Sequence, residues 1–295
     1  MDDEPIEEET PMSIRPYLLT GLALALLICT GAGGVWWKSQ QVFTRTHDDV
    51  PPVRIQVPLG DSEAIHEGER LGVIHGCVGC HTKTLGGKVA FDNDLYQLNS
   101  ANLTKGPDGI GNIDSDGMLA RAIRYGVRHD GRGVLGMPSA TLFAIDDVDL
   151  SLIIAWVRSK APVPTTLPPH TLRWKGRWLM ATGKLHSVGD SLYWAPKPPK
   201  SPPYGATLAY GQYLARTICA ECHGARLEGT TTAPGLEVVA GYDSTEFINA
   251  IIYGQARDGR LLKRSMPIER YDALNPEERT ALYLYLHSLH GPAAW

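Results

Sequence analysis

The sequence has few cysteines, no excess of basic charge and only one long uncharged apolar run. Five cysteines in 295 residues are too few for a disulfide-dense secreted scaffold. A single apolar run excludes a polytopic transporter, and 43% hydrophobic residues exclude a wholly disordered chain. The totals of 28 basic and 32 acidic residues become 27 and 26 once Arg15 and the six acids of residues 1–15 are subtracted. We therefore expect no nucleic-acid-binding face.

The apolar run extends from residue 17 to residue 37 without a charge, between Arg15 and Lys38. At about 1.5 Å per residue, a helix of this length covers a hydrocarbon core of roughly 30 Å. Tyr17 begins the run and Trp36 and Trp37 end it, where amphipathic rings favour the membrane interfaces. The run predicts a single transmembrane helix that contacts the lipid bilayer.

A cleaved signal peptide is the alternative for this run. Its apolar region is shorter, typically 7–15 residues, and it ends at a small-residue cleavage site that here has only Thr30-Gly31-Ala32 as a weak match. The tail before the run is also acidic rather than basic. An uncleaved anchor is favoured, and Cys29 is interpreted as a thiol packed within it.

The other four cysteines form two copies of the pattern Cys-x-x-Cys-His, at Cys77–His81 and Cys219–His223. Two thiols on one helical turn followed by an imidazole suit covalent attachment of haem c, with the histidine reaching the iron. A zinc site pairs such motifs about 15–20 residues apart rather than 142. A thioredoxin-like motif needs a βαβ setting, and two structural disulfides need no histidine after each pair. The sequence predicts two covalently bound haem c groups, held by the thiols of Cys77, Cys80, Cys219 and Cys222 and the axial ligands His81 and His223.

The surroundings of the two motifs repeat as well. Residues 121–138 match residues 249–267 through a Tyr-Gly pair, an Asp-Gly-Arg turn and a Met-Pro pair. Each methionine lies 19 residues before an aromatic residue, Trp156 or Tyr285, in a pattern typical of a helix. The repeat therefore predicts two homologous domains. The predicted order is an acidic tail (1–16), the transmembrane helix (17–37), a linker (38–61), domain 1 (62–160), a Pro/Trp-rich connector (161–203) and domain 2 (204–291).

Two segments do not repeat. Domain 1 is longer between its motif and its Tyr-Gly pair, and the extra residues, around 89–115, are rich in turn signals and predict loops. The connector has many prolines, which favour an extended chain, but also three of the seven tryptophans. We expect it to pack along a domain, with a short amphipathic helix within residues 172–183.

The two motifs, together with a Met-Pro pair before a terminal aromatic helix in each half, resemble the c-type cytochromes over residues 60–160 and 204–291. The resemblance implies a mainly α fold, with two tandem cytochrome c-like domains preceded by one transmembrane helix. It also implies that Met137 and Met266 are the second axial ligands, and that the carbonyl of Pro234 accepts a hydrogen bond from His223. Domain 1 has no such proline before Pro107. Residues 100–132 further resemble the cytochrome subunits of periplasmic dehydrogenases.

Four other polar residues lie near the motifs. Arg132 and Arg260 follow Asp-Gly in both halves, and each is either a haem propionate partner or a solvated turn residue. His75 and His129 do not repeat, and we interpret them as ordinary exposed or hydrogen-bonded histidines.

His/Met ligation leaves no open position on the iron, which favours electron transfer over catalysis. We expect a membrane-anchored dihaem cytochrome c that carries single electrons in a respiratory or photosynthetic chain, and no enzyme or small-molecule substrate. The alternatives are a cytochrome subunit of a periplasmic dehydrogenase complex and a dihaem peroxidase. Haem attachment outside the cytoplasm implies a single-pass protein of the bacterial cytoplasmic membrane, with a cytoplasmic N-terminus and periplasmic haem domains. Its expected partners are redox proteins or a larger membrane complex.

Overall fold

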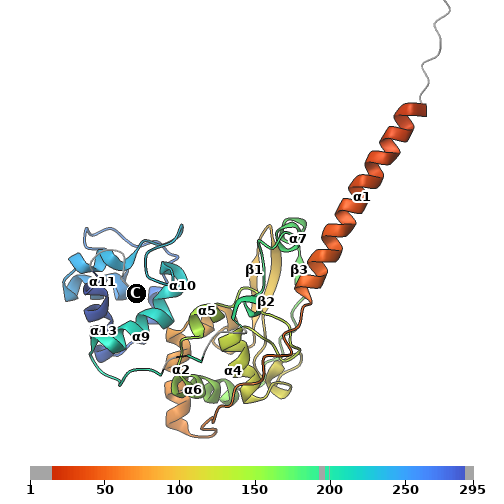
Figure 1. Cartoon of the computed structure of the whole chain (residues 1–295). Helices are drawn as coiled ribbons and strands as arrows, with labels where there is room; N and C mark the ends of the chain where they lie inside the picture. The colour runs from red at the N-terminus through yellow and green to blue at the C-terminus, as the bar shows by residue number, and fades with distance from the viewer. Residues whose placement is uncertain (1–14, 193–196, 199, 290–295) are drawn as a thin grey trace, which may run out of the picture.

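The computed structural model describes residues 15–192, 197–198 and 200–289, which are mostly helical (Figure 1). A long helix leads into a first half, a connector follows, and a second, smaller half ends the described chain. Most of the predicted acidic tail, Trp194 of the connector and the last two residues of predicted domain 2 lie outside the described residues.

The N-terminal helix α1 (Arg15–Phe43) is the one helix among the described residues that is long and apolar enough to cross a membrane. Its apolar window has a mean hydropathy of 2.0 and is not buried by the rest of the chain. The helix continues six residues past the predicted end at 37, so the predicted linker begins as helix. The reason is tertiary packing, because Ser39 is fully buried and its hydroxyl accepts a hydrogen bond from Arg177.

The first half is built around two crossing helices. Its helical elements are α2 (Ser62–Ile74), α3 (Cys77–His81), η1 (Ile110–Asn112), α4 (Asp116–Tyr125), α5 (Ser139–Leu142) and α6 (Asp147–Ser159). The carboxylate of Asp61 caps α2 and that of Asp146 caps α6. Gly68 lets α2 approach α6 closely, because a Cβ there would lie 1.9 Å from the carbonyl oxygen of Leu152. The indole of Trp156 packs fully buried beneath the next turn of α2.

A small antiparallel sheet replaces the predicted loops in the longer part of domain 1. Strands β1 (Lys88–Asp92) and β2 (Tyr96–Ser100) form a hairpin with a bulge between Val89 and Phe91. Strand β3 (Thr171–Leu172) comes from the connector and pairs with β2. The strands alternate only weakly in hydrophobicity and are short, so the turn residues around them dominate the sequence pattern.

The connector packs along the first half. After β3 it forms α7 (Trp174–Ala181), within the segment for which a short helix is predicted, and then α8 (Gly189–Leu192). Helix α7 lies against the end of α1. The linker before α2 is also fastened to this half, since His47 N–H donates to the Gly131 carbonyl and Val53 N–H to that of Gly117.

The second half repeats the helix crossing of the first. Its helical elements are α9 (Leu208–Leu214), the π-helical turn η2 (Ala215–Cys219), α10 (Ala220–His223), η3 (Leu236–Gly241), α11 (Ser244–Tyr253), α12 (Ile268–Tyr271) and α13 (Pro276–His287). A Cβ on Gly211 of α9 would lie 1.9 Å from the Ala281 carbonyl of α13, which matches the approach of Gly68 to α6. A capping box between Asn275 and Glu278 begins α13. In both halves, therefore, the helix that leads into the Cys-x-x-Cys-His motif crosses a later helix of the same half at close range.

Candidate haem-binding sites

The first motif forms helix α3, a short helix that begins after Gly76, whose φ of 77° suits glycine. The thiols of Cys77 and Cys80 are free and half-buried. Burial raises the pKa of the Cys77 thiol to about 11, so it is protonated at neutral pH. The imidazole Nδ1 of His81 lies 2.9 Å from the carbonyl oxygen of Ala101. A carbonyl only accepts, so Nδ1 carries the proton and Nε2 the lone pair.

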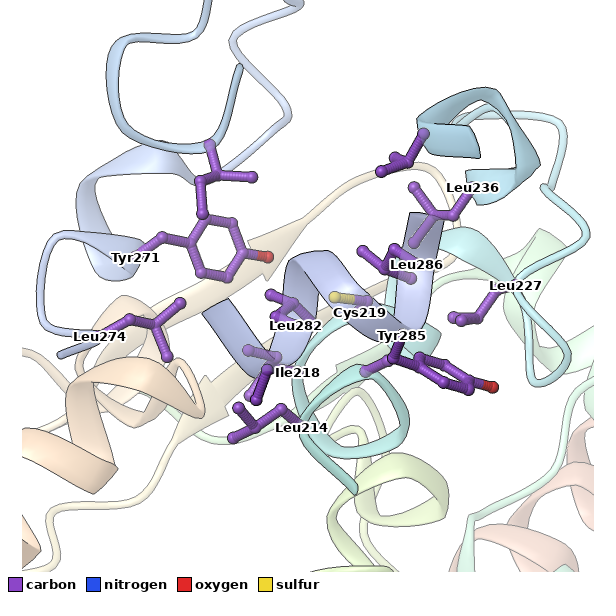
Figure 2. Packing of buried hydrophobic residues seen from close by; sticks show 14 of the residues in the cluster. Leu214, Ile218, Cys219, Leu227, Leu236, Tyr271, Leu274, Leu282, Tyr285 and Leu286 are labelled. Atoms are coloured by element: carbon purple, nitrogen blue, oxygen red, sulfur yellow. The ribbon is translucent and has the colours of Figure 1, made fainter. Parts of the chain in front are cut away.

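The second motif ends a continuous run of helix, from α9 through η2 into α10. Cys219 is buried and Cys222 is half-buried. Figure 2 shows the Cys219 sulfur among apolar side chains of α13, with Leu282, Tyr285 and Leu286 around it. The imidazole Nδ1 of His223 lies 2.7 Å from the carbonyl oxygen of Pro234. Burial lowers the pKa of both His81 and His223, which favours the neutral ring that a metal ligand needs.

Ala101 occupies in the first half the place that Pro234 has in the second. Leu85 and Leu227 each follow the motif histidine by four residues, are buried and have a positive φ, 58° and 61°. The carbonyl of Leu85 accepts a hydrogen bond from Leu103 N–H, and that of Leu227 accepts one from Leu236 N–H. Ala101 and Pro234 each lie two residues before these leucine donors. The first half therefore uses a carbonyl that does not belong to a proline, whereas the pattern His-x-x-x-Leu-x-Gly, followed later by a leucine, is present in both halves.

Equivalent loops also present the two methionines. The N–H two residues after each methionine donates to the methionine carbonyl at 2.9 Å, in both Met137 and Met266. Each side chain is half-buried at the edge of the hydrophobic cluster of its own half. Met137 joins the cluster that includes Cys77, and Met266 joins the one that includes Cys219. The structure thus brings each methionine to the core that its motif borders.

The two repeated arginines lie on the surface. Arg132 and Arg260 have side chains that are 46% and 65% exposed, and each sits in a turn whose aspartate accepts from the arginine N–H. Their guanidinium groups lie 3.9 Å and 3.6 Å from the same aspartates, Asp130 and Asp258. This is the geometry of a solvated turn residue, and a contact with haem propionates stays a prediction.

The remaining histidines near the motifs have other partners. His75 is buried, and its Nδ1 lies 2.8 Å from the Leu71 carbonyl within α2. Desolvation lowers the pKa of His75 to about 4. His129 lies 3.0 Å from the carboxylate of Asp114. Both therefore serve the local packing of the first half.

Arg270, which sequence reasoning missed, lies between the two motifs. A Cβ on Gly76, directly before Cys77, would lie 2.4 Å from Arg270 Nη1. The other terminal nitrogen of Arg270 donates to the carbonyl of Ile218, directly before Cys219, at 3.3 Å. Its guanidinium also lies 3.8 Å from the carboxylate of Glu221. One side chain of the second half therefore reaches the residues that directly precede both motifs, at the contact between the halves.

The donor set fits haem c at both motifs. Each half supplies two free thiols on one helical turn, a histidine whose protonated nitrogen is held by a carbonyl, and a methionine thioether at the border of the same apolar cluster. Thiols, imidazole and thioether are the groups that c-type haem ligation uses.

Comparison with known proteins agrees with this donor set. Residues 208–290 match the family model described as cytochrome c, so the second half contains a cytochrome c domain. The first motif lies outside the matched residues.

The chain is also homologous to dehydrogenase subunits. It is 30% identical over 172 residues to a subunit of nicotinate dehydrogenase from Pseudomonas putida, a match that covers 55% of this chain and 14% of that protein. It is 26% identical over 208 residues to the cytochrome c subunit of alcohol dehydrogenase (quinone) of Gluconobacter oxydans, covering 61% of this chain and 40% of that protein. The matches therefore span less than half the length of these curated relatives.

Proposed function

We propose that this protein carries two covalently bound haem c groups and passes single electrons between redox proteins outside a bacterial cytoplasmic membrane. The observation that carries the proposal is the repeated construction of the two motifs. In both halves the histidine Nδ1 is held by a carbonyl on a loop that a buried, positive-φ leucine fastens to the core. Such outer-sphere support orients a ligating imidazole and fixes its tautomer.

The residues of each site have separate tasks in this proposal. Cys77 and Cys80 in the first half, and Cys219 and Cys222 in the second, would hold the porphyrin through thioether bonds, which thiols form with vinyl groups without net oxidation or reduction. His81 and His223 would bind the iron through Nε2, and Met137 and Met266 would supply the thioether ligands. The leucines and aromatic residues around Cys219 exclude water from the second site.

Haem iron supplies one-electron redox chemistry, which none of the protein side chains provides under mild conditions. With histidine and methionine as its ligands, neither iron would keep an open position for a substrate. We therefore expect an electron carrier and not a catalyst.

The homologues favour a place within a dehydrogenase complex, the alternative raised from the sequence. One relative is named as the cytochrome c subunit of a quinone-dependent alcohol dehydrogenase, and the other as a subunit of nicotinate dehydrogenase. We propose that this chain is likewise the cytochrome subunit that takes electrons from a periplasmic dehydrogenase, with α1 as its membrane anchor.

The contact between the halves supports direct electron exchange between the two sites. Arg270 touches the residues that precede both Cys77 and Cys219. Helix α10 and the turn η2 also contact α5, the helix that follows Met137. We propose that an electron passes from one half to the other without leaving the protein.

Haem content and spectra of the purified full-length chain test this proposal. We expect two haems per 32.2 kDa chain, both low-spin and with the Fe–S(Met) absorption of His/Met ligation. Cys222→Ala should impair attachment in the second half, and Cys29→Ser should leave both haems in place. A single haem per chain would refute the dihaem assignment. A high-spin ferric haem would instead favour a peroxidase, because one iron would then be open.

A further inference from the structure

Four of the seven tryptophans gather where α1 meets the rest of the chain. Trp36 and Trp37 of α1 are 52% and 60% exposed, and Trp174 and Trp178 of the connector helix α7 are 54% and 53% exposed. Large aromatic side chains are normally well buried in soluble domains, as Trp156 is here. The four exposed indoles therefore mark a surface that meets something other than water.

Helix α7 is fastened to α1 at the end of its apolar run. The guanidinium of Arg177 lies over the ring of Trp36, 5.7 Å from its centroid, and donates to Ser39 Oγ at 3.1 Å. Figure 1 shows α7 at the end of the sheet beside α1, on the side of the first half from which α1 projects. The position of α7 along the axis of α1 is thus fixed near residues 36–40.

The exposed tryptophans of α7 do not arise from a loosely placed helix. Gly176 and Met180 are buried, and a Cβ on Gly176 would lie 2.1 Å from the Leu95 carbonyl in the β1–β2 turn. Trp174 and Trp178 are four residues apart, so they share a face of the helix other than the one that carries Gly176. The helix is therefore firmly seated with both indoles outward.

The segment around α7 carries basic residues and no acidic ones. Residues 170–189 contain two arginines, two lysines and no acidic residue. Arg173 is compensated by Asp92, and Lys175 lies 3.9 Å from Asp94 but is 66% exposed. Tryptophan with flanking lysine and arginine is the composition typical of a membrane interface, where the ring lies at the headgroups and the cation reaches phosphate.

The distance along α1 agrees with that position. If the apolar run of α1 spans the bilayer, about 20 residues from Leu18 cover roughly 30 Å and end at Trp37. Helix α7 packs directly beside this point. Its outward face therefore lies at the level of the lipid headgroups.

We propose that α7 is an interfacial helix that lies on the lipid surface, with Trp174 and Trp178 among the headgroups of the outer leaflet. The proposal rests on the proposed membrane anchor and goes beyond it. It makes α1 and α7 a two-point attachment, so the first half keeps one orientation to the membrane instead of turning about a single helix.

Nitroxide labelling of the full-length, haem-loaded chain in vesicles of phosphatidylcholine and phosphatidylglycerol tests the proposal. One label is placed on the native Cys29 and reports on the anchor itself. A second is placed at Thr182→Cys, and a third at Leu261→Cys as an aqueous reference, both in a Cys29→Ser background. Thr182 lies one turn beyond Trp178 and is exposed, and Leu261 is 74% exposed in the second half. The measured quantity is nitroxide collision with oxygen relative to a water-soluble nickel chelate.

We expect the label at 182 to give a ratio between the deep value at 29 and the aqueous value at 261. Replacing both indoles, Trp174→Ser and Trp178→Ser, should move the ratio at 182 toward the value at 261. A deep value at 29 with an aqueous value at 182 would overturn the interfacial helix and leave the anchor intact. An aqueous value at 29 would refute the anchor as well. If the label at 182 is protected from the nickel chelate only when a dehydrogenase subunit is bound, this face is a protein contact. That result would overturn the lipid assignment.

Discussion

Arg70 of the first half donates hydrogen bonds to both carboxylate oxygens of Glu278 in the second half. The two terminal nitrogens of Arg70 donate to Glu278 at 2.7 Å and 2.9 Å, and one of them also donates to the Ala273 carbonyl. The Glu278 side chain is 1% exposed and also caps α13 through the Asn275 N–H. A bidentate pair at this depth fixes the two halves in one orientation.

We predict that Arg70→Ala destabilises the haem-loaded chain by about 3 to 5 kcal/mol, because it leaves the Glu278 carboxylate buried without its cation. Denaturant unfolding followed by circular dichroism measures this loss. Arg226→Ala is the matched control, since that arginine is 67% exposed and lies 3.8 Å from Glu228 in a solvent-screened surface pair that contributes little to stability. Equal small effects of both variants would show that the halves are held by other contacts.

A second contact between the two halves, between Tyr213 and Asp149, predicts that the stability of the chain depends on pH. Tyr213 of the second half donates its hydroxyl to Asp149 of the first half at 2.6 Å. Burial raises the pKa of Asp149 to about 6, although the Tyr213 hydrogen bond opposes it. The folded state therefore binds a proton more tightly than the unfolded state, so this contribution is present below about pH 4 and is lost as the pH rises through about 6.

Asp149→Asn should remove that dependence. Comparing the free energy of unfolding of the variant and the parent between pH 4 and 7 isolates the Asp149 contribution from that of other groups. We expect the parent to lose stability relative to the variant as the pH rises. A difference that stays constant with pH, or grows in the opposite direction, would contradict the raised pKa.

The close helix crossings predict that one methyl group added to the glycine at either crossing lowers the stability of the chain. Gly68→Ala and Gly211→Ala each place a Cβ 1.9 Å from a backbone carbonyl, so the helices must separate. We expect each to cost about 1 to 3 kcal/mol or more. Gly241→Ala lies outside both motifs, and its Cβ would meet only the end of the flexible Arg257 side chain, at 3.3 Å, so this variant should be near neutral. Thermal unfolding would compare the three variants. A stable Gly211→Ala variant would mean that α9 and α13 pack less tightly than they do here.

The motifs and their repeat could be predicted from the sequence because covalent chemistry requires fixed residues at fixed spacing. Pro234 could be predicted from the family pattern, and its carbonyl lies against His223. Ala101 could not, because a backbone carbonyl can come from any residue, and the hairpin of β1 and β2 separates it from its motif. Arg70 and Arg270 were also beyond prediction. Their partners lie about 200 and 50 residues away, and no local pattern records such contacts.

We predict that Met266→Ala leaves both haems covalently bound but lowers the reduction potential of the second site, because a thioether ligand favours reduced iron. A potentiometric titration followed by absorbance measures both potentials. Met118→Ala is the control, since Met118 is also half-buried but has no counterpart in the second half. Unchanged potentials in Met266→Ala would show that this methionine is not an axial ligand.

Arg270 provides a test of the proposed proximity of the two sites. Its positive charge lies between Cys77 and Cys219, and positive charge favours the reduced state of a nearby iron. We predict that Arg270→Gln lowers both potentials by on the order of tens of millivolts, since about 1 kcal/mol corresponds to roughly 40 mV for one electron. Arg270→Lys should retain most of the parent values because it keeps the charge. A shift at one site alone would place that arginine beside a single haem, and the direct exchange between the halves would then lack its main support.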